Sequence, residues 1–191
     1  MRFKPRSATA LIMDKIKLDS SQQEMITLLE EHHSKSQVMI IAGLIGKKKK
    51  LFDSLIELCL IEDNLIPQRA SWVLDEVTQR YPNWIDPYVE NLSLSLSELK
   101  HGGTRRNITK VLSRSTLPIE NLGELLNVCF EWLVDKETPI AVRAHCMTIV
   151  YRISEIEPEI KGEFESILRE FVEIGSAGEK SRARRILKSH G

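Results

Sequence analysis

The stretch Pro-Ile-Ala-Val-Arg-Ala at 139–144 opens a run of apolar residues at helical spacing and decides how the rest of the chain is interpreted. Arg106 lies 37 residues before Arg143, and Arg69 lies 37 residues before Arg106. Each of these arginines is followed by an apolar stretch. Self-similarity at a fixed period of this length is typical of helical repeat proteins, so the chain is predicted to be one.

Apolar residues recur at helical spacing elsewhere, and no segment keeps a two-residue alternation. The clearest stripes run from Leu51 to Cys59 and from Ile160 to Val172. The connections are short, so neighbouring helices should pack antiparallel in pairs, each with a first or outer helix and a second or inner helix. Outer helices are expected near 21–33, 51–62, 86–100, 119–135 and 158–174, and inner helices near 35–46, 67–80, 103–114, 139–155 and 177–189.

Several helix starts carry capping signals. A serine followed three residues later by glutamate can satisfy two free amides of the first turn, and an Asp or Thr before proline suits the N-cap position. The predicted caps are Ser21 with Glu24, Ser176 with Glu179, Asp86 before Pro87, and Thr138 before Pro139.

The 139–144 motif, with its proline, its Val-Arg pair and the small residue that follows, resembles the second helix of the HEAT repeat. The resemblance covers roughly residues 51–190 and extends to 21–46. It implies an all-α, right-handed superhelix, or solenoid, of about five antiparallel helix pairs. Residues 20–191 are expected to form a single domain after an N-terminal arm or short helix at 1–19. Tetratricopeptide repeats fit worse, because their small-residue and aromatic pattern at a 34-residue period is absent.

Composition excludes several classes of protein. The longest apolar run, Val38 to Gly46, is too short to cross a membrane. Cys59, Cys129 and Cys146 are odd in number and lie among apolar residues, which favours reduced core thiols and a cytoplasmic location. No phosphate loop, dinucleotide fingerprint, nucleophile elbow or zinc motif occurs, so no cofactor or metal is expected.

The net charge of zero conceals a segregation of charge between the two kinds of helix. The outer segments carry −18 in total and the inner segments +15. In a HEAT-like solenoid the second helices line the concave surface, so the resemblance implies a basic trough that would attract an acidic protein segment. The predicted partner-binding residues are Lys47, Lys48, Lys49, Lys50, Arg105, Arg106, Lys110, Arg114, Arg182 and Arg185.

A structural interpretation of the same basic residues stays open. An arginine at the start of an inner helix can bond to the preceding repeat, and Arg69 and Arg143 are candidates for that role. The run Lys47 to Lys50 can be a solvated loop that also favours the carbonyl end of the preceding helix. The leading hypothesis is nevertheless a non-enzymatic binding or scaffold module.

Nucleic-acid binding is the alternative, and one pair of residues connects it to an enzyme. Trp72 and Glu76 are four residues apart and therefore share one face of an inner helix. They loosely resemble the aromatic and carboxylate arrangement of HEAT-like DNA-alkylation-repair glycosylases, although that family uses aspartate where Glu76 stands. In the competing interpretation, Trp72 packs between repeats and Glu76 pairs with Arg69 or Arg80.

Overall fold

The computed structural model describes residues 18–63 and 65–190, so most of the predicted N-terminal arm, residues 1–17, lies outside the described residues. Every regular element in the described ranges is a helix, and the all-α prediction is confirmed. The chain forms two compact units, Met1–Pro82 and Asn83–Gly191, which are described separately below. This division into units does not decide whether residues 20–191 form one domain, so that expectation stays a prediction.

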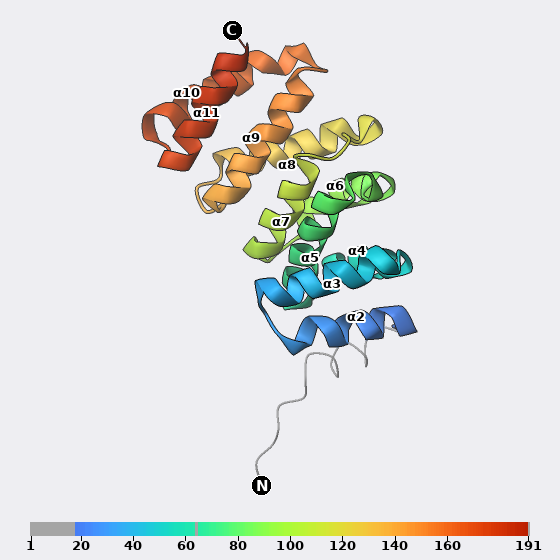
Figure 1. Ribbon diagram of the computed structural model, residues 1–191. Coiled ribbons are helices and arrows are strands. Elements are labelled where there is room, and N and C mark those ends of the chain that lie inside the picture. Colours follow the sequence, from blue (N-terminus) through green and yellow to red (C-terminus); the bar gives the residue numbers. More distant parts are fainter. Residues whose placement is uncertain (1–17, 64, 191) are drawn as a thin grey trace. The chain divides into compact units, whose positions relative to one another are not determined.

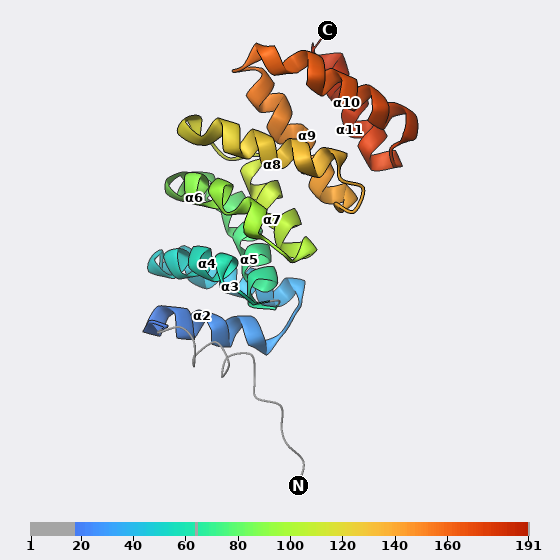
Figure 2. The same ribbon diagram turned by 180° about the vertical axis from the view of Figure 1, so that it is seen from behind.

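Unit 1 contains two antiparallel helix pairs (Figure 1 and Figure 2). Its helices are α2 (Ser20–Glu31), α3 (Lys35–Lys47), α4 (Lys50–Leu60) and α5 (Ile66–Arg80). The outer helices α2 and α4 pack against each other, the inner helices α3 and α5 do the same, and α4 packs on α5. The pairs therefore form two layers, as the alternation of outer and inner helices predicts.

The core of unit 1 follows the apolar stripe of α4. Phe52, Leu55 and Leu58 are completely buried, and Leu74 of α5 is buried with them. Each large apolar side chain removed from water contributes about 1.5–3 kcal/mol. Because neither pair could bury its stripe alone, the stacking of the two pairs stabilises both.

Unit 2 continues the same alternation through three further pairs (Figure 1). Its inner helices α7, α9 and α11 lie side by side in that order, and each outer helix is followed by the inner helix of its own pair. The α-helices are α6 (Val89–Leu94), α7 (Gly102–Leu112), α8 (Leu122–Val134), α9 (Ile140–Ser154), α10 (Lys161–Ile174) and α11 (Ala177–His190). Short 3-10 helices at Pro82–Trp84, Asp86–Tyr88, Leu96–Glu98, Ile119–Asn121 and Pro158–Ile160 lie in the connections.

The core of unit 2 is centred on α9. Cys146, Met147 and Val150 of α9 are completely buried, as is Phe164 of α10. Phe164 meets Phe130 of α8 edge to face, with ring centroids 6.5 Å apart, a favourable aromatic geometry. This contact holds the last two outer helices together at one point along their length.

The prediction of one continuous helix over 86–100 is wrong. The segment divides into a 3-10 turn, the short α6 and a second 3-10 turn. The hydroxyls of Ser93 and Ser95 donate to the carbonyls of Val89 and Asn91, at 2.7 and 2.8 Å. Serine is less favourable than most residues in a helix interior because its hydroxyl bonds the backbone locally, and an apolar stripe does not reveal this preference.

Both predicted proline-preceding caps are also wrong. The Asp86 carboxylate accepts from the hydroxyl of Thr116 at 2.9 Å instead of capping a helix. The Thr138 hydroxyl donates to Asp135 Oδ2 at 2.8 Å, and the N-cap position of α9 belongs to Pro139. Both side chains are occupied by distant or loop partners that sequence spacing alone does not show.

Of the two predicted capping boxes, the first is wrong and the second is correct. Asp19 and Gln22 form the box of α2, two residues before the predicted serine: Asp19 Oδ1 accepts from the Gln22 amide at 2.8 Å, and Gln22 Oε1 accepts from the Asp19 amide at 2.9 Å. Ser176 and Glu179 form the predicted box of α11. The Ser176 amide donates to Glu179 Oε2 at 2.8 Å, and the Glu179 amide donates to Ser176 Oγ at 3.4 Å.

All three cysteines are free and buried, as predicted. Burial raises the pKa of the Cys59 thiol well above its ordinary value. In unit 2 a hydrogen bond to Cys146, together with burial, raises the pKa of Cys129. Thiols with a raised pKa stay protonated near neutral pH and are poor nucleophiles.

Candidate functional site

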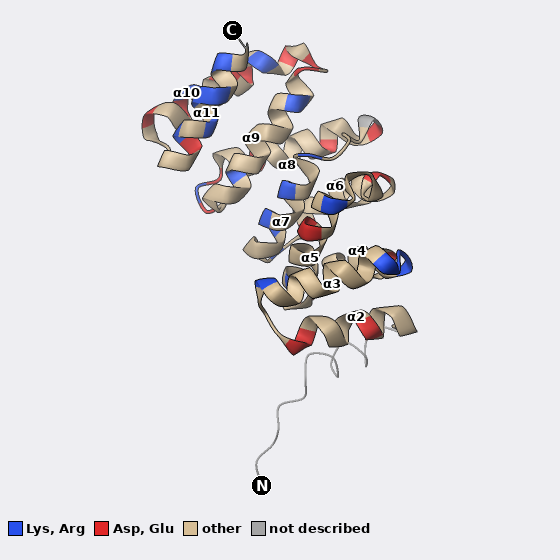
Figure 3. Cartoon of the chain, viewed as in Figure 1, with Lys and Arg blue, Asp and Glu red and all other residues tan. Residues whose placement is uncertain are grey.

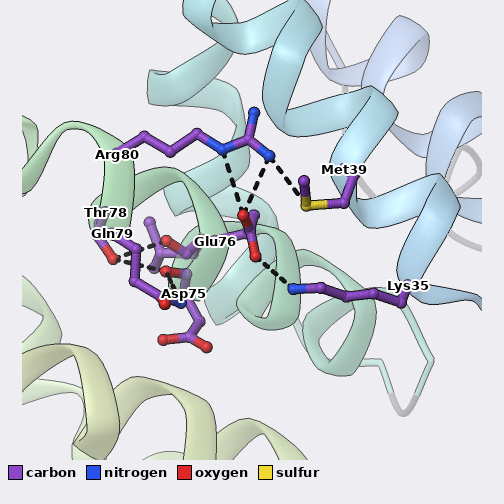
Figure 4. A network of polar contacts seen from close by, with 8 residues as sticks. Lys35, Met39, Asp75, Glu76, Thr78, Gln79 and Arg80 are labelled. Atoms are coloured by element: carbon purple, nitrogen blue, oxygen red, sulfur yellow. Dashed lines mark hydrogen bonds and ion pairs between the residues drawn. The ribbon is translucent and has the colours of Figure 1, made fainter.

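Trp72 and Glu76 lie one turn apart on α5 in unit 1. Glu76 Oε2 accepts a hydrogen bond from Lys35 Nζ of α3 at 2.5 Å, and Oε1 accepts from Arg80 Nη2 at 3.1 Å. Figure 4 shows the carboxylate between these two cations, with Arg80 also reaching the sulfur of Met39 at 3.0 Å. The Glu76 side chain is 13% exposed, so its charge is both sheltered and paired.

This pairing sets the chemistry of Glu76. The hydrogen bond from Lys35 lowers the pKa of the carboxyl below its ordinary value; burial opposes that shift and Arg80 adds to it. The group is therefore ionised at neutral pH. Two cations already neutralise it, which leaves less negative charge to stabilise a positive charge on a substrate.

The surroundings of Trp72 also favour the structural interpretation. Its ring lies edge to face against His33, with centroids 5.2 Å apart, and the residue is half-buried. Arg69 does not reach Glu76, because its Nη1 donates to the carbonyl of Leu29 at 2.6 Å. A catalytic role for Trp72 and Glu76 stays a prediction. In the described part of the chain, no three His, Cys, Asp or Glu residues are grouped as a metal site requires.

The inner layer of unit 2 carries most of the predicted basic residues. The formal charges of α7, α9 and α11 are +3, +2 and +4, whereas those of α6, α8 and α10 are −1, −2 and −2. Figure 3 shows lysine and arginine recurring along the three inner helices. Since α7 packs on α9 and α9 on α11, helices of positive charge are neighbours in this unit.

Some of these arginines point inward and hold the fold together. The guanidinium of Arg105 lies 5.2 Å from the ring centre of Trp132 on α8, and its Nε donates to the carbonyl of Leu99. Arg143 repeats the arrangement one pair later: it lies 5.8 Å from the ring centre of Phe171 on α10, and its Nη1 donates to the carbonyl of Asp135 at 3.2 Å. Each arginine therefore links the residues just before its own helix to an aromatic residue of the next outer helix.

This repeated contact corrects the register of the sequence repeat. Arg105, not Arg106, is the structural equivalent of Arg143, since Arg105 makes the aromatic and carbonyl contacts and Arg106 is exposed. Two adjacent arginines cannot be distinguished by spacing alone. The inward one is recognised only when the aromatic residue of the next helix is in place.

Two further arginines connect neighbouring inner helices. Arg152 Nη1 donates to the carbonyl of Ser113 at 3.1 Å, at the carboxyl end of α7, where a cation is favoured. Arg182 Nη1 of α11 donates to Thr148 Oγ1 of α9 at 2.5 Å. Burial, and for Arg182 also the neighbouring Arg185, lowers the pKa of both guanidinium groups. Arg105 and Arg182, both predicted to bind a partner, are thus bonded within the fold.

The remaining predicted cations are more accessible. Arg106, Arg114 and Arg185 are exposed, and Lys110 is half-buried. The sequence prediction omitted Arg184 and Lys188, which are exposed on the same helix as Arg185. Both lie on a helix whose apolar residues occupy one side, and this pattern in the sequence was the signal that could have identified them as exposed. The side chains of Arg106, Arg184, Arg185 and Lys188 make no hydrogen bond or ion pair with any described residue.

The run Lys47 to Lys50 belongs to unit 1 and is exposed throughout. Lys47 closes α3, and Lys48 is its C-cap, with the backbone amide donating to the carbonyls of Leu44 and Ile45. Lys48 Nζ also lies 3.3 Å from Glu24 Oε1 in an exposed ion pair. Both lysines sit where a cation complements the helix dipole, so they have a local role besides any contact with a partner.

A family model of the HEAT repeat domain matches residues 25–190, which spans both units. No curated protein and no solved structure matches the chain. None of the described helices has the length and apolar character that crossing a membrane requires.

Proposed function

The chain belongs to the HEAT repeat family, and on that premise we propose that it is a non-enzymatic scaffold that binds an acidic segment of a partner protein. HEAT repeats are helical scaffolds that generally serve protein interaction. The proposed contact surface, called here the basic inner face, consists of the accessible cations of α7, the turn after it and α11. These are Arg106, Lys110, Arg114, Arg184, Arg185 and Lys188.

One observation carries this proposal: Arg106, Arg184, Arg185 and Lys188 are exposed and have no ionic partner among the described residues. Arg105, Arg143, Arg152 and Arg182, in contrast, are bonded internally. Internal bonding accounts for one set of arginines and leaves the other set unexplained by the fold. A partner with several carboxylates would give those cations the charge-assisted hydrogen bonds that they lack.

Several contacts would be needed for useful affinity. An exposed ion pair contributes only about 0.2–1 kcal/mol, so a single carboxylate would bind weakly. An acidic segment that follows two or more inner helices would engage several arginines at once, and complementary charge would speed the encounter. Within this proposal Arg105 and Arg182 position their helices, and Lys47 to Lys50 offer a second basic surface on unit 1.

Nucleic acid is the second candidate, because phosphates would satisfy the same exposed arginines. Affinity for DNA or RNA would fall with salt, with a log-log slope of about −0.9 per phosphate contacted. The enzymatic form of this alternative requires Glu76, whose charge is balanced by Lys35 and Arg80. We therefore expect no release of alkylated bases from methylated DNA by the purified protein.

The experiment is a titration of the protein into fluorescein-labelled probes: a glutamate-rich peptide, and single- and double-stranded DNA and RNA of similar length. Anisotropy is measured at low salt and at about 0.15 M, where surface charges are screened beyond about 8 Å. We expect the peptide to bind at both salt concentrations, and more tightly than the nucleic acids. Steeply salt-dependent binding of DNA or RNA in preference to the peptide would put the nucleic-acid function first, and no binding of any probe at low salt would reject the basic inner face.

A cytoplasmic location is part of the same proposal. It is supported by three free cysteines buried in the core, which suit a reducing compartment. Labelling by a fluorescent-protein fusion in cells would test it.

A further inference from the structure

A second surface of unit 2 has a different character from the basic inner face. A groove of about 380 Å³ lies where the turn from α8 to α9 faces the carboxyl-terminal half of α10 and the turn to α11. We call it the turn groove. Its apolar lining includes Leu133, Val134, Ile140, Ile167, Phe171 and Ile174.

The rim of the turn groove is apolar and exposed. Val134 is 65% exposed, Ile140 49% and Ile174 72%, and Ile174 is the most exposed large apolar side chain in the described residues. Other exposed apolar side chains, such as Ile156 and Leu94, lie outside the groove. Isolated exposed apolar residues are common, but their concentration around a concavity marks an interaction site.

The packing of the last two outer helices explains why the groove is open. Phe130 of α8 meets Phe164 of α10 at 6.5 Å between centroids. Beyond that contact α8 ends at Val134, while α10 continues to Ile174, and its residues Ile167, Phe171 and Ile174 line the groove. The open side therefore follows from the offset of the two helices at this contact, because four residues of α8 but ten of α10 lie beyond it.

The polar groups of the groove are arranged with opposite charges on its two walls. Arg143 and the exposed Lys136 come from the α8–α9 wall, and the exposed Glu170 comes from α10. The guanidinium of Arg143 is fixed by Glu179 Oε1, at 2.6 Å from its Nε, and by the ring of Phe171. Its Nη2 has no hydrogen-bond acceptor among the described residues and can donate to a bound carboxylate.

We propose that the turn groove binds an amphipathic peptide segment of a partner protein. Large apolar side chains of the peptide pack on Val134, Ile140 and Ile174, and a carboxylate of the peptide faces Lys136 and Arg143. The charge of the two walls sets the direction of the peptide, since a basic side chain suits Glu170 and an acidic one suits the opposite wall. A peptide supplies apolar side chains and charges at fixed spacing, which matches a lining of this mixed kind. The inference does not depend on the basic inner face.

The test is a methyl NMR titration of isoleucine-labelled full-length protein. The probe is an acetylated helical peptide of about four turns with Leu at i, i+3, i+4 and i+7 and Glu beside them. We expect saturable shifts of the Ile140 and Ile174 methyls and unchanged Ile40 and Ile156 methyls, although those two are 56% and 49% exposed. Peptides with Ser replacing Leu, or Lys replacing Glu, should shift none of them.

Two variants test the placement. Ile174→Asp should weaken binding about tenfold or more, because the most exposed rim contact is lost. The matched control Ile156→Asp, outside the groove, should bind as the wild type does. Arg106→Glu with Arg185→Glu should also leave the methyl shifts unchanged, which separates this groove from the basic inner face.

Several outcomes would overturn the proposal. These are no shift at millimolar peptide, equal shifts at Ile40 and Ile156, or no effect of Ile174→Asp. Concentration-dependent shifts without peptide would assign the groove to a second copy of the chain. Shifts produced by sodium dodecanoate at lower concentration than by the peptide would assign it to a lipid-like ligand.

Discussion

Arg143 shows how a single side chain connects the repeats. Its Nε is 2.6 Å from Glu179 Oε1 of the next inner helix, its Nη1 reaches the carbonyl of Asp135, and its face covers Phe171. The Arg143 and Glu179 side chains are only 14% and 2% exposed. Removing one partner of a buried ion pair leaves the other charge uncompensated and destabilises the fold, so each residue depends on the other.

Replacing Glu179 by Gln should therefore destabilise the protein. The substitution keeps the size of the side chain but leaves Arg143 without its carboxylate, and breaking a buried pair in this way costs about 3 kcal/mol. Urea denaturation at neutral pH measures the change. The control Glu165→Gln removes an exposed pair with Arg169 and should cost less than about 1 kcal/mol; equal losses in the two variants would contradict the buried pair.

The pH dependence of stability should follow the same pair. Burial alone would raise the pKa of Glu179, but the hydroxyl and amide of Ser176 and the guanidinium of Arg143 hold it below the ordinary value. The native state thus binds this proton less readily than the unfolded state, so the stabilisation is present above the unfolded pKa of about 4.3 and is lost as the pH falls through the native pKa. The difference in urea midpoint between the wild type and Glu179→Gln should shrink below about pH 4. A difference that stays constant down to about pH 3 would show that the ionised form of Glu179 is not what stabilises the fold.

At the scale of helices, apolar periodicity predicted most elements, because the stripes of α4 and α10 are wide and uninterrupted. It failed at 86–100, which divides into two 3-10 turns and the short α6 although its apolar spacing is helical. It also could not distinguish Arg105 from Arg106, because the decisive partner, Trp132, lies on another helix. Local patterns therefore predicted helix positions, whereas the roles of individual arginines depend on contacts between helices.

A side chain at Gly175, in the turn between α10 and α11, should destabilise the protein. A Cβ at this position would lie 2.5 Å from the carbonyl oxygen of Phe171, a backbone atom that cannot move without shifting the end of α10. Gly175→Ala should lower stability by about 1–3 kcal/mol, as other overpacking substitutions do.

Gly178→Ala is the matched control for this turn. A Cβ at Gly178, in the first turn of α11, would meet nothing within 4 Å. Alanine is the better helix former, so this variant should be neutral or more stable by up to about 1 kcal/mol. The melting temperatures of both variants are the measurement. A Gly175→Ala protein as stable as Gly178→Ala would contradict the close approach of residue 175 to the Phe171 carbonyl.

For the chain as a whole, charge is divided by layer. The outer helices α2, α4, α6, α8 and α10 are each net negative, and the inner helices α3, α7, α9 and α11 are each net positive. The inner helix α5 is neutral because Asp75 and Glu76 offset its two arginines. This division was visible in the sequence, since helix order alone reveals it. The accessibility of each cation was not visible in the sequence, because burial separates Arg105 and Arg182 from Arg106 and Arg185 only in the folded protein.

The most direct test of the proposed function compares two double variants of the full-length protein that lower its net charge equally. Arg106→Glu with Arg185→Glu reverses charge on the basic inner face, and Lys161→Glu with Arg169→Glu does so on the outer helix α10. Binding of the labelled glutamate-rich peptide is measured by anisotropy at about 0.15 M salt. We predict that the inner variant loses affinity about tenfold or more while the outer variant stays within about twofold of the wild type. Equal losses in both variants, or none in the inner one, would contradict the assignment of partner binding to the inner helices.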